Sequence, residues 1–227
     1  MLKLLCFIFL VLRPAAIRAQ EPLFCMEEGT VLEYERRYVD SGKLKWSQEL
    51  SILSVVAGED GSRTVAYSTE FRNAKGRTMY GGPVQLSVQI RKDGSVLADL
   101  AGSMKAVLEN VLPDATVGGD ACMTLLPSEF EDGDTLPDAA FTLTAAGIPY
   151  KVEVSGREFL RRETISTAAG EFDCVVVFER KKERGLRKRT TSALTWYAPG
   201  IGMVRHDTYS DKGELETSER LVSMTKR

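Results

Sequence analysis

Apolar and polar residues alternate along most of the chain, and the alternation has a period of two. Successive side chains of a β-strand point to opposite faces, so this period predicts strands that bury one face and expose the other. Short turn sequences such as Asp40-Ser41-Gly42 separate the alternating runs, and each predicts a tight reversal between antiparallel neighbours. One of the clearest runs places apolar residues at Val84, Leu86, Val88 and Ile90.

The pattern predicts about ten to eleven strands, divided into two groups. No helical stretch alternates with them, which excludes a parallel α/β sheet. Rolling or folding so many strands removes the long exposed edges of a flat sheet. We therefore expect an all-β fold, an antiparallel meander that forms a curved sheet, a barrel or a two-layer sandwich. The predicted strands lie near 30–39, 43–56, 62–73, 77–91, 95–98, 140–146, 149–163, 172–183, 187–197, 202–210 and 214–225.

A single segment follows helical spacing instead of the strand period. Asp99 precedes it as a candidate N-cap, and Pro113 follows it as a stop. We expect one short amphipathic helix here, which either plugs an open end or concave face of the sheet or forms a lid over an apolar cavity. The Gly-, Pro- and Asp-rich stretch that follows predicts a long connection with one short strand around 123–125. The apolar positions of the helical segment are Leu100, Met104, Val107, Leu108, Val111 and Leu112.

Residues 1–19 are typical of a cleavable signal peptide. They combine the positive charge of Lys3, an apolar run from Leu4 to Leu12 and the small residue Ala19 at the expected cleavage point. The apolar run is roughly half of the ~20 residues that a membrane-spanning helix needs. We expect residues 20–227 to form a single β domain that is extracytoplasmic, either periplasmic or secreted, and that has no transmembrane anchor.

The charge balance changes when this leader is removed. The chain has 30 basic and 32 acidic residues, and three of the basic ones lie in the leader, so 27 and 32 remain. The resulting net charge near −5 argues against bulk affinity for nucleic acid. The sequence also lacks a phosphate-binding loop and aromatic residues interleaved with basic ones. We therefore expect no nucleic acid partner and no cofactor.

The cysteines and the single histidine offer little chemistry. Three cysteines remain after cleavage, which allows at most one disulfide within a monomer. We expect Cys25 to pair with Cys122, and Cys174 to be a buried thiol on the apolar side of a strand. His206 lies in a predicted strand without the GxSxG motif of a hydrolase, so we interpret it as structural. These scattered residues predict no metal site.

The densest charge cluster contains seven basic residues among the ten from 180 to 189. Predicted strands flank it and Gly185 lies near its middle, so it forms a hairpin in either of two interpretations. The first is a long hairpin with a solvated tip. The second is docking to an anionic surface such as lipid headgroups, lipopolysaccharide or an acidic partner. The candidate residues are Arg180, Lys181, Lys182, Arg184, Arg187, Lys188 and Arg189.

A stretch near the C-terminus, Trp196-Tyr197-Ala198-Pro199-Gly200-Ile201-Gly202, combines an aromatic strand end with a Pro-Gly turn and a new strand. Together with the segments 29–34, 169–174 and 207–221, it resembles the TapB-like family of secreted proteins. The resemblance implies an all-β extracytoplasmic domain and supplies no catalytic residue. Members look distantly like envelope lipoprotein carriers, whose curved sheets wrap a concave apolar face around acyl chains, which is an analogy of fold alone.

We interpret the protein as a non-enzymatic binding protein of the envelope or exterior, with a lipid or another apolar envelope molecule as a candidate ligand. Two alternatives stay open: a structural or protein-interaction module of the cell envelope, and a hydrolase whose site is not recognisable. The candidate ligand-binding residues, which would otherwise be ordinary core, are Met104, Val107, Leu108, Val111, Trp196 and Tyr197.

Overall fold

The computed structural model describes residues 21–112, 114 and 116–227. The expected signal peptide at 1–19 lies outside the described residues, and so does the helix stop expected at Pro113. Within the described residues the chain forms fourteen strands and one helix. These elements are β1 (Thr30–Tyr38), β2 (Leu44–Ala57), β3 (Arg63–Asn73), β4 (Val84–Ile90), β5 (Val96–Asp99), α1 (Leu100–Val111), β6 (Val117–Gly118), β7 (Met123–Leu126), β8 (Thr135–Leu136), β9 (Ala139–Ala145), β10 (Ile148–Thr167), β11 (Gly170–Arg184), β12 (Lys188–Ala198), β13 (Gly202–Tyr209) and β14 (Leu215–Lys226).

All the strands belong to one antiparallel sheet, which confirms the predicted fold class. The order from edge to edge is β6-β9-β10-β11-β12-β13-β14-β1-β2-β3-β4-β5-β7, with β8 pairing with β10 beside this path. The first and last strands of the chain, β1 and β14, pair with each other and so join the two predicted strand groups. The sheet is curved and not closed, because β6 and β7 remain as its two edges.

The predicted strand at 77–91 is shorter than expected. Strand β4 begins only at Val84, because Gly81 and Gly82 adopt positive φ angles of 75° and 125° and Pro83 follows them. Proline also removes a backbone donor that a ladder would use. The two-residue strands β6 and β8 were not predicted, because they are too short to produce an alternating pattern.

The main core lies against the middle of the sheet. Fully buried aliphatic residues from β1, β2, β3, β13 and β14 meet in one cluster, so residues from both ends of the chain share a core. Each such side chain stabilises the fold by roughly 1.5–3 kcal/mol relative to exposure. A second cluster packs α1 against β9 and β10. The central members of the main cluster are Leu32, Ile52, Val65, Val204 and Leu221.

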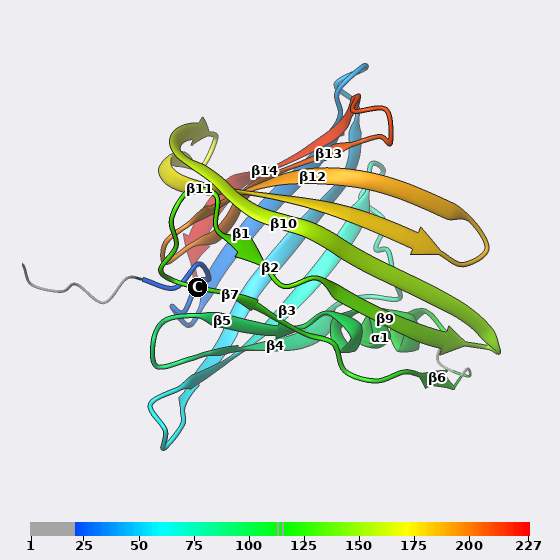
Figure 1. Ribbon diagram of the computed structural model, residues 1–227, viewed down its shortest axis with the longest axis horizontal. Helices are drawn as coiled ribbons and strands as arrows, with labels where there is room; N and C mark the ends of the chain where they lie inside the picture. The colour runs from blue at the N-terminus through cyan, green and yellow to red at the C-terminus, as the bar shows by residue number, and fades with distance from the viewer. Residues whose placement is uncertain (1–20, 113, 115) are drawn as a thin grey trace, which may run out of the picture.

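Helix α1 occupies the concave side of the sheet, near its two edges (Figure 1). It packs against β4 and β7 from one edge region and against β6 and β9 from the other. Asp99 is the N-cap, as predicted, and its Oδ1 accepts hydrogen bonds from the backbone N–H groups of Gly102 and Cys122 at 2.9 Å each. At the other end, Asn110 donates to the carbonyl oxygen of Tyr80 at 2.8 Å. Both helix ends are therefore fixed to neighbouring segments.

Side chains bridge the gap between β7 and β10, which no backbone pairing joins among the described residues. Arg157 of β10 donates from Nη1 to Oγ1 of Thr124 in β7 at 2.6 Å. The same nitrogen lies 3.4 Å from the carbonyl oxygen of Pro137. We call this opening, spanned by Arg157 and Thr124, the seam.

Candidate functional site

A large apolar cavity of about 1080 Å³ lies between the sheet and helix α1. We call it the entrance chamber. The period-two pattern of β2, β3 and β4 brings aromatic and aliphatic side chains to one face, and the 3.6-residue period of α1 brings a second apolar wall opposite. The strand wall includes Trp46, Phe71 and Leu86, and the helix wall includes Met104, Val107 and Leu108.

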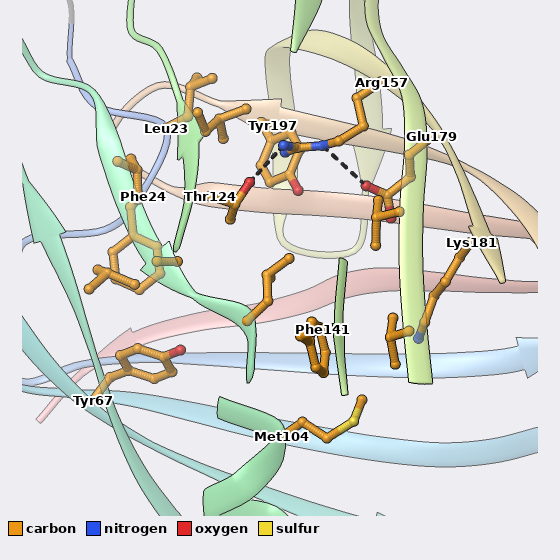
Figure 2. A pocket seen from close by; sticks show the side chains of 17 residues that line it. Leu23, Phe24, Tyr67, Met104, Thr124, Phe141, Arg157, Glu179, Lys181 and Tyr197 are labelled. Carbon is orange, nitrogen blue, oxygen red and sulfur yellow. Dashed lines mark hydrogen bonds and ion pairs between the residues drawn. The ribbon is translucent and has the colours of Figure 1, made fainter. Parts of the chain in front are cut away.

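A smaller cavity of about 360 Å³, the inner chamber, adjoins the entrance chamber (Figure 2). The two share Tyr67, Leu100, Met104 and Lys181 as lining residues, so they are neighbours. A third cavity of about 210 Å³ shares Leu23, Phe24 and Tyr197 with the inner chamber, and it shares Gln48 and Leu50 with the entrance chamber. These three cavities therefore adjoin one another on the concave side of the sheet.

The inner chamber contains one charged cluster among its apolar residues. Arg157 and Glu179 face each other there, with Nε of the arginine 3.8 Å from Oε2 of the glutamate (Figure 2). The Nε–H of Arg157 is buried and has no hydrogen-bond partner among the described residues. Burial raises the pKa of Glu179 above its usual value, although the positive charges of Arg157 and Lys181 oppose that shift. The cluster compensates most of its own charge.

Charged residues also stand at the entrance chamber. Tyr150 donates from its hydroxyl group to Oε1 of Glu183 at 2.6 Å, and Lys181 forms an ion pair with the same oxygen at 2.9 Å. Burial acts to raise the pKa of Glu183, but these two partners outweigh it and the pKa lies below its usual value. Arg189 pairs with Glu216 at 2.6 Å, while Arg187 lines the chamber beside them.

Three of the four predicted helix residues line the chambers. Met104 contacts both the entrance and the inner chamber, and Val107 and Leu108 line the entrance chamber. Val111 lines neither of them and is exposed at the end of the helix. The helix is a fixed wall of the chambers, since hydrogen bonds hold both of its ends.

The predicted aromatic pair is divided between two faces of β12. Tyr197 lines the inner chamber. Trp196 is buried elsewhere: its indole N–H donates to Glu163, and the guanidinium of Arg205 lies 4.4 Å from its ring centroid. Because adjacent strand residues point to opposite faces, a neighbouring pair of this kind does not enter one cavity together.

Strand alternation also divides the basic hairpin. Lys181, Arg187 and Arg189 line the entrance chamber. The remaining candidates do not line that chamber, so the hairpin presents basic residues both to the cavity and away from it. The second set comprises Arg180, Lys182, Arg184 and Lys188.

The predicted Cys25–Cys122 disulfide is absent from the structure, and both cysteines are free, as is Cys174. Cys25 lies in the main core cluster, whereas Cys122 packs against the cluster under α1, so the two belong to separate parts of the core. His206 is half-buried, and its Nδ1 lies 2.9 Å from Oγ1 of Thr195. Burial and the nearby charge of Arg36 lower its pKa to about 3. Among the described residues, no group of three or more His, Cys, Asp or Glu side chains is placed to hold a metal ion.

Several residues of the site were not predicted from the sequence. Tyr67 and Phe71 alternate with polar neighbours in β3, so their shared face could have been inferred, but not the cavity in front of it. Arg157 and Glu179 lie on different strands, and no local pattern signals their meeting. Leu23 and Phe24, just before β1, line the inner chamber although no periodic run includes them.

The comparison with protein families gives a match to the DUF3108-like model over residues 27–221. The chain belongs to the DUF3108-like family. Solved structures resemble this DUF3108-like protein over nearly its whole length. A protein of Bacteroides fragilis NCTC 9343, described as exported and as having a YmcC-like fold, is 24% identical with a TM-score of 0.73, covering 91% of this chain and 100% of that one.

A protein of Parabacteroides distasonis ATCC 8503, described as a lipoprotein, is 19% identical to the DUF3108-like chain with a TM-score of 0.74. The match covers 90% of this chain and 99% of the other. No curated protein matches the chain significantly. These likenesses show the fold, while the TapB-like resemblance stays a prediction. The described part of the DUF3108-like protein contains no helix with the length and apolar character needed to span a bilayer.

Proposed function

We propose that this DUF3108-like protein is an extracytoplasmic binding protein for an amphiphile that carries an acyl chain. The entrance chamber is the observation that carries the proposal, because its volume of about 1080 Å³ reaches the upper end of ligand pockets and its walls are mainly apolar. The expected signal peptide and the exported or lipoprotein descriptions of the structural neighbours support a location outside the cytoplasm.

The arrangement of the chambers favours a long, flexible ligand. The cavities adjoin one another and their walls are mainly apolar, which suits a hydrocarbon chain, whose burial is favourable by ~0.8 kcal/mol per CH₂ group. Arg187 and Arg189 stand at the entrance chamber, where they suit an anionic headgroup. The Arg157–Glu179 pair largely neutralises itself, so a neutral chain can pass it.

A bulky substitution in the helix wall tests the proposal. Val107→Trp fills part of the entrance chamber, so we expect the affinity for the apolar fluorescent probe N-phenyl-1-naphthylamine to fall about tenfold or more, as the loss of a few buried CH₂ contacts requires. Fluorescence titration of the mature protein measures this affinity, and competition with a fatty acid measures binding of an acyl chain.

Val111→Trp is the matched control, because it adds the same side chain one turn further along the same helix at an exposed position. We expect it to bind the probe with nearly unchanged affinity. Equal probe binding by both variants, or no binding by the unsubstituted protein, would contradict the proposal. Native mass spectrometry of protein purified from its own envelope should in addition show a bound lipid mass.

The two alternative functions have less support. A protein-interaction role through an open strand edge would use β6 or β7, which are only two and four residues long. A hydrolase that used His206 would need it as a base, but the histidine is half-buried beside Thr195, and a pKa of about 3 makes it a poor base.

A further inference from the structure

Exposed apolar residues surround the opening of the entrance chamber. The β9–β10 and β11–β12 hairpins project on the same side of the molecule as α1 (Figure 1). Leu186 in the β11–β12 turn is 87% exposed, and Ile148 at the start of β10 is 46% exposed. Tyr80 and Leu112, each 38% exposed, line the chamber with them. We call these four residues the rim, and exposed apolar residues gathered around one cavity typically mark an interaction site.

A row of positive charges lies directly beside the rim. Register places Lys151 of β10 opposite Arg184 of β11, and Arg184 opposite Lys188 of β12. Like charges that face each other across strands destabilise a sheet. Lys151 forms an ion pair with Glu153. Within the part of the chain that the structure describes, none of Arg184, Arg187 and Lys188 forms an ion pair. A negatively charged partner would relieve this repulsion.

We propose that the rim docks on the surface of a bilayer that contains anionic lipids. Leu186 and Ile148 enter the headgroup layer, while Arg184, Arg187 and Lys188 contact the lipid phosphates. Basic residues next to exposed apolar ones are the combination that an anionic membrane surface binds. The entrance chamber then faces the membrane, so an acyl chain can move between bilayer and chamber without crossing water. Docking goes beyond the proposed function and can be measured separately from it.

Charge reversal at the hairpin tests the docking. The mature protein is sedimented with vesicles of phosphatidylcholine alone and with vesicles that also contain phosphatidylglycerol. We expect binding only to the second kind, and we expect Arg184→Glu, Arg187→Glu and Lys188→Glu together to weaken it about tenfold or more. The matched control reverses three exposed basic residues on the β2–β3 and β4–β5 hairpins, Arg63→Glu, Arg91→Glu and Lys92→Glu, and should keep the binding.

The apolar contribution has its own pair of variants. Leu186→Ser should weaken vesicle binding several-fold. Val56→Ser removes an exposed apolar side chain elsewhere, in β2, and should not weaken it. Absence of binding by the unsubstituted protein, or equal binding by the two charge-reversed triples, overturns the docking. Vesicle binding together with failure to bind N-phenyl-1-naphthylamine would instead overturn the ligand chamber and leave the docking intact.

Discussion

Arg157 is the residue that connects the two sides of the seam. It bonds Thr124 and faces Glu179, so replacing it removes both a bridge and a charge partner. We expect Arg157→Met to lower the free energy of unfolding by about 2 kcal/mol near neutral pH, because it leaves a largely buried carboxylate without its counter-charge. Urea unfolding, followed by tryptophan fluorescence, measures the change.

The pH dependence of this loss distinguishes a buried charge from simple loss of packing. An acid whose pKa is raised in the folded state binds more protons when folded. The destabilisation that it causes is therefore absent at low pH and grows as the pH rises. Burial already raises the pKa of Glu179, and removal of Arg157 raises it further. The variant should therefore lose less stability near pH 5 than near pH 8. Adding Glu179→Gln should remove this difference, and a loss independent of pH would contradict the argument.

We expect His206 to give protein stability the opposite pH dependence. Its pKa falls from about 6.5 to about 3 on folding, so between these values the unfolded chain binds the extra proton and stability decreases as the pH falls. Because of this residue, we expect the free energy of unfolding to be about 2 kcal/mol lower at pH 5 than at pH 7. His206→Asn should have a flatter stability curve over that range. Parallel curves for the two proteins would show that His206 does not cause the change.

At the scale of elements, helix α1 depends on Asp99. The carboxylate accepts hydrogen bonds from Gly102 in the helix and from Cys122 before β7. Asp99→Ala should destabilise the protein by roughly 1–2 kcal/mol and weaken probe binding, because the wall of the entrance chamber loses its attachment. Asp99→Asn keeps an acceptor oxygen and should retain most of the stability, as measured by thermal unfolding.

Glu109→Ala serves as the control for this helix. It removes a partly exposed pair with Lys105 at 3.8 Å, and such pairs contribute little. We expect it to leave the unfolding temperature almost unchanged. A similar loss for Glu109→Ala and Asp99→Ala would contradict the special role of the cap, because alanine is itself a good helix former and should not destabilise α1 at position 109.

The sequence predicted the elements well and the site poorly, for different physical reasons. Strand and helix periods depend on which residues avoid water, and that requirement is visible locally, as at Val84 or Leu100. A packed core and a lined cavity remove the same residues from water. Val107 and Val111 therefore look equivalent in the sequence, although only Val107 faces the entrance chamber.

At the scale of the whole molecule, charge is distributed unevenly, and the net charge does not show this. Residues 20–227 carry an excess of acidic residues, so their net charge is repelled by an anionic surface. The row from Lys151 to Lys188 reverses that sign at the opening of the entrance chamber. In the proposed docking, repulsion of the body and attraction of the basic row together would favour a single orientation on an anionic membrane.

The seam has a consequence for the range of cargo that one such protein can hold. A closed cylinder of strands fixes its girth through strand number and stagger, so widening it would break a backbone ladder. Here the sheet is open, and Arg157 of β10 and Thr124 of β7 join across the opening through their side chains. Breaking that contact would remove no backbone pairing between strands. If the chambers bind an acyl chain as we propose, a wider seam would make room for a branched or paired chain.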